Sequence, residues 1–166
     1  MKNIRTPNID DVSRLAEIHI YGWRDAYRNI MSDELLFKQR QVMKTIKLHT
    51  RFINDIFHRV IVYDDGIIRG FAIHNDPRDS NTDGQYEISA LYVEPAFQRM
   101  GIGTKLLAAI ELYAKKHAIS STYVWVLDGN KKGISFYKKC GYVFDGAEKV
   151  VSIEDELREI KMVKAM

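Results

Sequence analysis

The sequence predicts an α/β (α+β) fold, with a mixed, mostly antiparallel sheet of about seven strands flanked by about four helices. Two observations carry this expectation. β-Branched and apolar runs occur as a hairpin pair, Arg59–Tyr63 and Ile67–His74, around Asp64-Asp65-Gly66. A strand–helix–strand unit follows at Gln85–Leu127, and its two strands should be parallel with a right-handed crossover. The chain of 166 residues is long enough for a single domain, 1–166, with its own core.

The first part of the chain is expected to be one short strand followed by helices. Lys2–Thr6 has strand character, and a helix can begin at Asn8 or Asp10 and run to about Arg28, because apolar residues recur there at helical spacing. A serine and two acidic residues, the usual pattern of a helix start, then precede Leu35–Asp55. Helical character, with a break, is expected through that segment.

The second half of the chain predicts four strands and two helices beyond the hairpin. Pro95 ends the first of these strands, Asn130 caps the second helix, and Gly141 stops it. The expected elements are Gln85–Glu94, Gly101–His117, Thr122–Leu127, Asn130–Cys140, Tyr142–Ser152 and Leu157–Val163.

Composition excludes several classes of protein. A net charge of +3, from 25 basic and 22 acidic residues without a basic cluster, argues against a nucleic-acid partner. No apolar run is long enough to span a membrane, and the N-terminus lacks the pattern of a secretory signal. The single cysteine, Cys140, rules out a disulfide within the chain, and the histidines form no metal-ligand pattern. A cytoplasmic protein without a metal is expected.

The stretch Gln98–Leu107, QRMGIGTKLL, indicates an anion site. A strand, a glycine-containing turn and a helix start place unpaired N–H groups at the positive end of a helix, and Arg99 and Lys105 add charge. The dinucleotide fingerprint requires a third glycine where Leu106 stands, and the order of Thr104 and Lys105 does not fit a P-loop. A tight turn with no ligand is the alternative interpretation.

Two motifs together resemble those of the GCN5-related N-acetyltransferase (GNAT) family. Gln98–Gly103 fits the pyrophosphate signature Q/R-x-x-G-x-G/A. Asn130–Tyr142 is similar to N-x-x-A-x-x-F-Y-x-K-x-G-F, with Gly133 in place of Ala and Tyr142 in place of Phe. The order of elements also fits, so the resemblance extends over the chain and implies the acyl-CoA N-acyltransferase fold.

The resemblance implies acetyl-CoA as co-substrate. Its pyrophosphate would lie on the N–H groups of the glycine turn, and its pantetheine arm would pair with the end of the fourth strand, where a β-bulge interrupts the ladder. The Leu91 N–H is the candidate to polarise the thioester carbonyl. The implied cofactor-binding residues are Leu91, Tyr92, Val93, Gln98, Arg99, Met100, Gly101, Ile102, Gly103, Thr104, Lys105, Asn130 and Tyr137. An N-cap alone would also explain Asn130.

The resemblance also implies two catalytic side chains. Tyr137 would protonate the departing thiolate, the alternative being a buried tyrosine of the core. Glu87 would deprotonate the amine, the alternatives being a solvated glutamate or one that only holds the substrate ammonium. Cys140 is expected to be a small buried residue rather than a nucleophile. Direct attack of the amine in a ternary complex is therefore expected.

The acceptor side is less defined. Trp23 and Tyr27 are the candidate substrate-binding residues because W-x-x-x-Y places them on one helix face, although such aromatics can equally pack the core. Loop acids could attract a cationic amine or could be solvated turn residues; they are Asp76, Asp79, Asp83, Asp155 and Glu156.

The expected function is an N-acetyltransferase acting on a primary amine, with a small molecule such as a polyamine preferred as substrate. A protein N-terminus or lysine side chain, a non-catalytic acyl-CoA-binding module and a nucleotide-phosphate binder are the alternatives. A homodimer is possible through the final strands.

Overall fold

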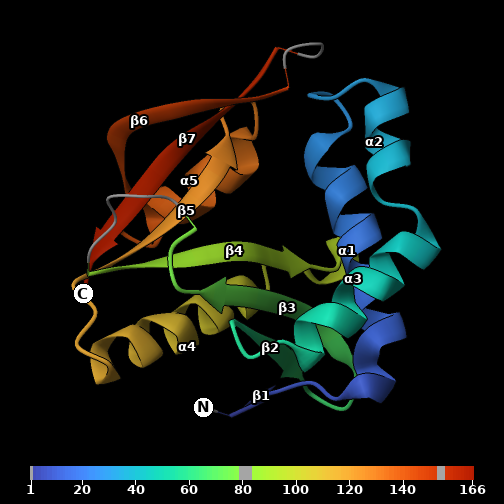
Figure 1. Cartoon of the computed structure of the whole chain (residues 1–166), viewed down its shortest axis with the longest axis horizontal. Coiled ribbons are helices and arrows are strands. Elements are labelled where there is room, and N and C mark those ends of the chain that lie inside the picture. Colours follow the sequence, from blue (N-terminus) through green and yellow to red (C-terminus); the bar gives the residue numbers. More distant parts are fainter. Residues whose placement is uncertain (1, 79–83, 153–155) are drawn as a thin grey trace.

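One sheet of seven strands, in the order β1-β2-β3-β4-β5-β7-β6, runs through the computed structural model of the chain (Figure 1). The structure describes residues 2–78, 84–152 and 156–166. The strands are β1 (Ile4–Arg5), β2 (His58–Asp64), β3 (Ile68–Asn75), β4 (Gln85–Val93), β5 (Ser121–Leu127), β6 (Val143–Ser152) and β7 (Leu157–Ala165). The helices are α1 (Val12–Tyr27), α2 (Asp33–Gln39), α3 (Val42–Asn54), α4 (Ile102–Lys116) and α5 (Lys131–Lys139). Short 3₁₀ turns lie at η1 (Ile9–Asp11) and η2 (Pro95–Phe97).

The expected mixed sheet is confirmed, and one count differs. The segment Leu35–Asp55 forms two helices, α2 and α3, so the described chain has five helices instead of about four. Leu36 of α2 and Thr45 of α3 are both buried. They are nine residues apart, about two and a half turns, so a continuous helix would place them on opposite faces. The break at Arg40, in a non-helical conformation (φ −121°, ψ 64°), lets both residues face the interior.

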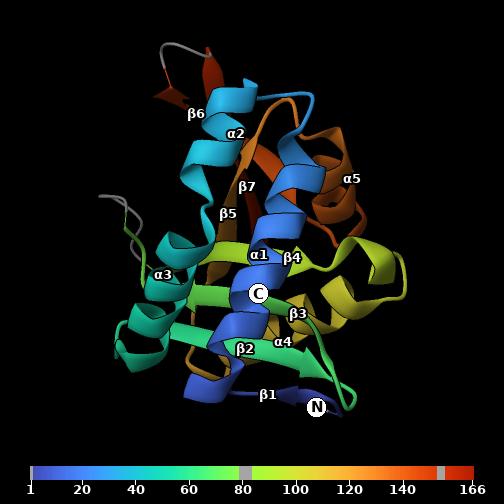
Figure 2. The same ribbon diagram turned by 90° about the vertical axis from the view of Figure 1, so that its right-hand side faces the viewer.

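Helices cover both faces of the sheet, and each face has its own apolar cluster. On one face, Leu106 and Ile110 of α4 pack with Ala72 of β3 and Ile88 of β4. On the other, α1 and α3 lie over a cluster that contains Phe71 of β3. Figure 2 shows α1 and α3 in front of the strands and α4 behind them. The functional elements are therefore anchored to a core that is filled on both sides.

The strand–helix–strand unit is parallel, as expected, but its strands pair only briefly. β4 and β5 pair at Gln85↔Ser121, Tyr86↔Thr122 and Glu87↔Tyr123, and not beyond. β4 then continues along β3, whereas β5 continues along β7. Figure 1 shows the two strands diverging from a common start. The sheet therefore has a V-shaped opening at its centre.

None of the helices in the described ranges is both long enough and apolar enough to cross a membrane.

Candidate functional site

The chain turns into α4 through the glycine segment that the sequence marks as an anion site. Gly101 is the N-cap, its backbone is left-handed (φ 77°, ψ 4°), and no side chain caps the helix. The Lys105 N–H donates to the Gly101 carbonyl at 3.1 Å, so the N–H groups of the three residues between them have no helical acceptor. A Cβ on Gly101 would meet nothing within 4 Å. Free backbone donors thus face an open surface at the positive end of the α4 dipole.

Gly103 has a different purpose from Gly101. A Cβ at Gly103 would lie 3.2 Å from Cζ of Phe136 and 3.6 Å from Cδ2 of Leu91. The absent side chain therefore lets α4 approach α5 and β4 closely. The sequence interpretation assigned both glycines to the turn and to the exposed N–H groups, whereas the structure shows that Gly103 also serves packing.

The side chains around the turn point in different directions. Arg99 has a left-handed backbone (φ 63°) and is exposed, as is Met100. The ammonium of Lys105 lies 3.4 Å from the Tyr63 hydroxyl and 5.0 Å from the centre of its ring, on β2. Gln98 Nε2 donates to Asp25 of α1 at 3.2 Å. Of the two expected cations, Arg99 is exposed at the turn and has no ion pair within the described ranges, and Lys105 is directed to the sheet.

The free edge of β4 carries backbone groups that β5 no longer pairs. The register of β3 against β4 shifts so that Ser89 is an extra, bulged residue, which confirms the expected bulge. Glu94 N–H donates to the Arg69 carbonyl on the β3 side. Hydrogen-bonding directions alternate along an antiparallel pair, so the N–H groups of Leu91 and Val93 face the opposite side, into the opening between β4 and β5.

Tyr137 is buried on α5, beside the opening. Its ring lies 5.1 Å from that of Phe136 and 5.5 Å from that of Tyr142. Burial raises the pKa of Tyr137 well above its ordinary value, with smaller effects from Tyr142, Tyr27 and Cys140. The hydroxyl is therefore protonated at neutral pH and can act only as a donor of that proton.

Asn130 caps α5, as the sequence predicts. Its side-chain oxygen accepts a hydrogen bond from the Gly133 N–H at 2.9 Å. A Cβ on Gly133 would come within 2.7 Å of Asn130 Nδ2, so the glycine makes room for the cap. Gly133 stands where the family pattern has alanine, and this contact gives the exchange a local reason.

Glu87 is the most constrained of the candidate side chains. Its carboxylate is 2% exposed and is paired with Arg78, whose side chain is 61% exposed. Arg78 Nε lies 3.0 Å from both carboxylate oxygens, its backbone N–H donates at 3.1 Å, and Tyr123 donates its hydroxyl at 3.2 Å. The alternative interpretation of Glu87 as a solvated glutamate is therefore wrong, because its carboxylate is buried and paired with Arg78. The role as base stays a prediction.

Trp23 and Tyr27 lie on one face of α1 and belong to a larger aromatic group. Their rings are 4.7 Å apart in an edge arrangement. The ring of Tyr92 on β4 lies 4.7 Å from that of His19, one turn before Trp23. Burial raises the pKa of Tyr27, and the side chains of Tyr92, Glu159, Arg40 and Asn130 act on it as neighbours. Tyr27 therefore lies on α1 next to Tyr92 of β4 and Asn130 at the start of α5, and Trp23 packs against it.

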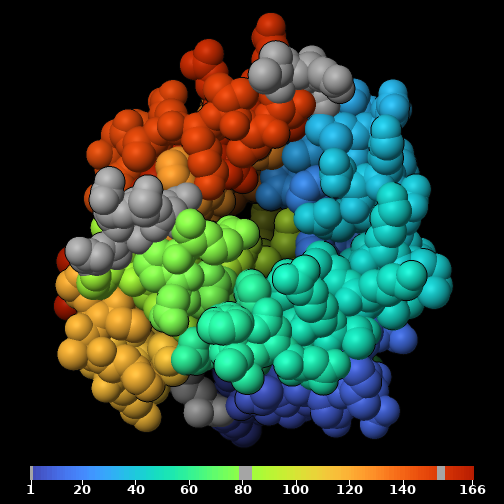
Figure 3. Space-filling view, viewed as in Figure 1, coloured from blue at the N-terminus to red at the C-terminus, as the bar shows by residue number. Residues whose placement is uncertain are grey.

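A hollow lies over this region of the molecule. Figure 3 shows it near the centre, between α2 at the upper right and the β6–β7 pair at the upper left. Trp23 and Tyr27 are half-buried, so they are neither sealed in the core nor fully open to solvent. This combination of partial burial and a surface hollow is compatible with a pocket wall.

Several side chains near the site were missed by the sequence interpretation. They are His19, Arg40, Arg78 and Glu159. His19, Trp23 and Tyr27 recur every four residues, so the helical spacing already contained a signal for His19. The contacts of Arg40, Arg78 and Glu159 join separate elements, and no local pattern reveals them.

The loop acids contribute little that the structure describes. Asp76 and Glu156 are exposed. Asp79, Asp83 and Asp155 lie outside the described residues. Their part in attracting an amine stays a prediction.

Cys140 is a free, half-buried thiol at the end of α5. Burial raises the pKa of the thiol, which keeps it protonated and disfavours a nucleophilic role. Within residues 2–78, 84–152 and 156–166, no three His, Cys, Asp or Glu side chains gather in a group that could hold a metal ion.

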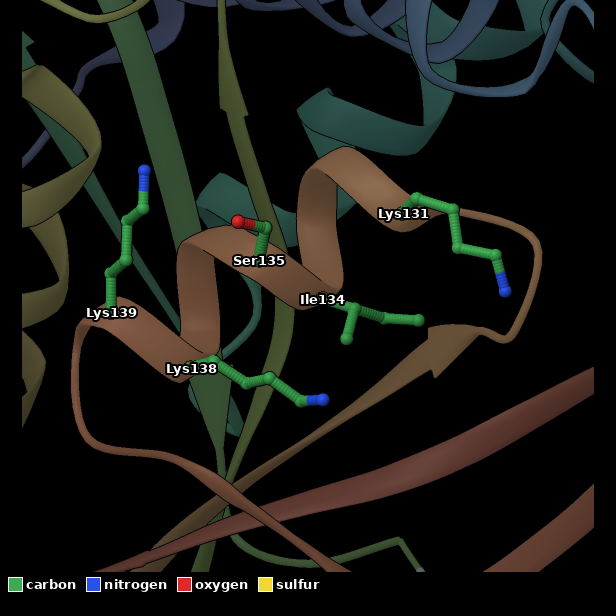
Figure 4. Close-up of a pocket in the computed structure, with 5 residues that line it drawn as sticks. All are labelled: Lys131, Ile134, Ser135, Lys138 and Lys139. Atoms are coloured by element: carbon green, nitrogen blue, oxygen red, sulfur yellow. The ribbon is translucent and has the colours of Figure 1, made fainter.

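A shallow basic pocket lies on the outer surface of α5. It is lined by Lys131, Ile134, Ser135, Lys138 and Lys139. Figure 4 shows Ile134 and Lys138 projecting on the same side of the helix and Lys139 projecting away from them. The sequence interpretation did not single out this surface. α5 contacts α4 at Gly103, so the pocket lies on the helix that flanks the glycine turn.

Comparisons with known proteins agree with this geometry. The model of the acetyltransferase (GNAT) family matches residues 16–142. An uncharacterised N-acetyltransferase, YuaI of Bacillus subtilis (strain 168), is 28% identical over 138 residues, which cover 83% of this chain and 78% of that protein. The residues 16–142 that the family model matches contain the glycine turn, β4 and most of α1.

Solved structures share the fold at low sequence identity. The PaiA N-acetyltransferase of Thermoplasma acidophilum, in complex with coenzyme A, superposes with a TM-score of 0.75 at 23% identity over 98% of each chain. The acetyltransferase YncA of Salmonella typhimurium, with its cofactor acetyl-CoA, gives a TM-score of 0.70 at 18% identity and covers 98% of this chain and 92% of its own.

Proposed function

Because the chain belongs to the acetyltransferase (GNAT) family, we propose that it moves an acetyl group from acetyl-CoA to a primary amine of a small molecule, by direct attack in a ternary complex. It is an acetyl-CoA-dependent N-acetyltransferase without a metal cofactor. One observation carries the proposal furthest: at Gly103, just after the open glycine turn, α4 packs against both Leu91 on the free edge of β4 and Phe136, the neighbour of the protonated Tyr137 on α5.

The residues of the turn suit a pyrophosphate. Unpaired N–H groups after Gly101 point to an open surface, and Arg99 is exposed beside them. Gln98, Met100, Ile102, Gly103 and Thr104 complete the proposed contact segment, with Lys105 directed toward β2. The lysines on the outer surface of α5 give the phosphates of the nucleotide end a second positive neighbour.

The pantetheine arm suits the opening between β4 and β5. Leu91 and Val93 offer unpaired N–H and carbonyl groups along this edge, as an extra strand would require, with Tyr92 between them. Acetyl-CoA supplies the acetyl group as an activated thioester. The Leu91 N–H would donate to the thioester carbonyl and stabilise the negative charge that develops on its oxygen.

The two proposed proton transfers use side chains with opposite properties. Tyr137 is buried and protonated, so it can give its proton to the departing thiolate and regain one from solvent. Glu87 is proposed to accept the amine proton, directly or through water. Its ion pair with Arg78 must open for this, which the exposure of Arg78 permits. Asn130 holds the start of α5 and thereby the position of Tyr137.

Trp23 and Tyr27 are proposed to bind the acceptor. Their rings lie 4.7 Å apart on α1 and are half-buried, and Glu159 adds a second carboxylate near Glu87 that would attract an ammonium group. Burial raises the pKa of Glu159, and the ammonium of Lys149, 3.6 Å from its carboxylate, offsets part of this effect. The acceptor that the sequence favours, a polyamine, stays a prediction.

The test is release of CoA from acetyl-CoA with a broad panel of primary amines. Turnover with a small amine that is lost in Tyr137→Phe, while acetyl-CoA binding persists, is the expected result. Acetyl-CoA binding without turnover on any amine, peptide N-terminus or lysine peptide would favour a non-catalytic acyl-CoA module. Stabilisation of the fold by ATP or NAD, and not by CoA, would favour a nucleotide binder instead.

Three remaining predictions complete the proposal. Residues 1–166 are proposed to act as one domain, which the single sheet supports. A homodimer is possible through β6, an edge strand with exposed apolar residues such as Val143 and Val150. A cytoplasmic location rests on the composition of the chain.

A further inference from the structure

The break between α2 and α3 places one arginine over the aromatic group of α1. The guanidinium carbon of Arg40 lies 4.1 Å from the centre of the Trp23 ring. Its Nε donates to His19 Nε2 at 3.1 Å, and its Nη1 donates to the Gln39 carbonyl at 3.1 Å. Arg40 is half-buried, so these contacts hold a partly desolvated cation against the aromatic group.

Arg40 has no carboxylate partner among the residues that the structure describes. No Asp or Glu oxygen in these ranges lies within 4.0 Å of its guanidinium. In contrast, Arg5, Arg14 and Arg69, also partly buried, each reach a carboxylate oxygen at 2.7 Å or less. A desolvated cation without a counter-ion is costly, and burial lowers the pKa of Arg40 accordingly. An anion from outside the chain would remove this cost.

A pair of buried histidines fixes the orientation of Arg40. His19 Nε2 accepts from Arg40, so its proton lies on Nδ1, which is 3.0 Å from His49 Nε2. His49 in turn carries its proton on Nδ1, a buried atom with no acceptor in the described chain. Burial, together with the charge of Arg40, lowers the pKa of both histidines, so both remain neutral acceptors for this arrangement. The guanidinium is thus preorganised rather than free to swing.

The charges of the site are separated across the aromatic group. Tyr27 is within electrostatic range of both Arg40 and Glu159, which form no ion pair with each other in the described ranges. Glu159 in turn is close to Glu87. Tyr27 and Tyr137 also influence one another, which links this group to the proposed general acid. A substrate with an ammonium at one end and an anion at the other fits this separation.

We propose that Arg40 binds the carboxylate of the acceptor, and that the substrate is therefore an amino carboxylic acid. The inference rests on the proposed function. It narrows the acceptor from small primary amines to amino carboxylic acids, in place of the polyamine that the sequence favours. The planar guanidinium is held by His19 and the Trp23 ring, and Nη2 has no acceptor among the described residues. Nη2 and the second hydrogen of Nη1 therefore remain for a carboxylate, which arginine can bind with two parallel hydrogen bonds. The amine then lies toward Glu159 and Glu87, on the side of Tyr137.

Matched acceptors test this charge requirement directly. CoA release is measured with L-leucine, L-leucinamide and isopentylamine, and with L-lysine, L-lysinamide and 1,5-diaminopentane, with spermidine alongside. Each amide has the size of its acid, and its amine is less basic and therefore more often unprotonated. A preference for the acid then cannot come from the reactivity of the amine. Wild-type protein should prefer each acid to its amide by 10-fold or more in kcat/KM. In Arg40→Gln the preference should vanish, mainly through KM.

Two further variants separate charge from folding. Arg40→Lys keeps the charge without the planar fork and should retain part of the preference. Arg28→Gln changes an exposed arginine just after α1 and should leave the preference unchanged. Thermal unfolding of each variant with bound CoA reports whether the fold is intact.

The outcomes separate this inference from the proposed function. Amides, diamines or spermidine used as well as the acids, with the same ratio in Arg40→Gln, would overturn the role of Arg40 and leave acetyl transfer standing. Absence of CoA release with every amine would contradict the proposed function. Calorimetric titration of L-leucine and L-lysine into the CoA-bound protein then decides the role of Arg40: binding that Arg40→Gln loses supports it, and no binding refutes it.

Discussion

Mild acid should destabilise this protein through three histidines that are buried in the neutral form. His19, His49 and His74 are each at most 3% exposed. Burial lowers the pKa of His49 and His74 to about 4, with Arg40 facing the first and Arg59 facing the second. Burial also lowers the pKa of His19 well below its ordinary value. None of the three can take up a proton without leaving its environment or disturbing it.

The magnitude follows from the difference between folded and unfolded chains. An unfolded histidine has a pKa of about 6.5, so below that pH the unfolded state binds more protons than the folded state. Stability is therefore full above about pH 6.5 and falls as the pH drops toward 4. At pH 5 the loss is about 2 kcal/mol for each histidine, or about 4 to 6 kcal/mol for all three, since His19 and His49 share a hydrogen bond. Whole domains have only about 5 to 15 kcal/mol.

Other titrating groups fall outside this window or have the opposite sign. Ion pairing with Arg5 lowers the pKa of Asp11 and Asp64, so these carboxyl groups lose stability only below about pH 4. Burial raises the pKa of Glu159, which favours the folded state on acidification. A decrease in stability between pH 7.5 and pH 5 would therefore come from the histidines.

Urea titrations at pH 7.5, 6.5, 5.5 and 5.0, followed by circular dichroism, measure the free energy of unfolding. His74→Gln should reduce the difference between pH 7.5 and pH 5 by about 2 kcal/mol. His117→Gln, at the exposed end of α4, is the matched control and should leave that difference in place. A free energy of unfolding that is constant over this range, or equal slopes in His74→Gln and wild type, would refute the reasoning.

Three further perturbations address the site. Tyr137→Phe should lower kcat by about 10²-fold or more, because the hydroxyl acts only as the thiolate leaves; calorimetry should show acetyl-CoA binding within a few-fold of wild type, and unchanged turnover would remove the general-acid role. Gly101→Ala should lower the free energy of unfolding by about 1 to 2 kcal/mol, since its φ of 77° is unfavourable for alanine although space is open; an unchanged urea midpoint would contradict this. Glu87→Gln should flatten the acidic limb of the pH profile of kcat/KM, and a profile that keeps its shape would restrict Glu87 to its ion pair with Arg78.

The parts of the site that the sequence predicted are those that depend on neighbours in the chain. The glycine turn before α4 and the Asn130 cap on α5 follow from short-range hydrogen bonding, and both are confirmed. The mixed sheet was predictable for the same reason, because each strand and turn has its own local pattern.

Features that join distant segments were not predictable. The ion pair of Arg78 with Glu87 joins the segment after β3 to β4, so it depends on how these two strands are placed and not on a local pattern. The contact of Arg40 with His19 depends on the break between α2 and α3, which no glycine or proline marks. Gly103 shows the same limit: its role in packing appears only once Phe136 of α5 is placed beside it.

The bulge at Ser89 has a consequence for the whole site, because a strand repeats every two residues. Before the bulge, Tyr86 and Ile88 join the apolar cluster under α4; after it, Leu91 and Val93 do. One extra residue has thus changed the parity of the strand. If Ser89 were instead an ordinary paired residue of a regular strand, the two faces of everything that follows would be exchanged: Ala90 and Tyr92 would face α4, and the N–H groups of Leu91 and Val93 would turn to β3. A single inserted residue therefore decides which backbone amides this enzyme can offer to a thioester.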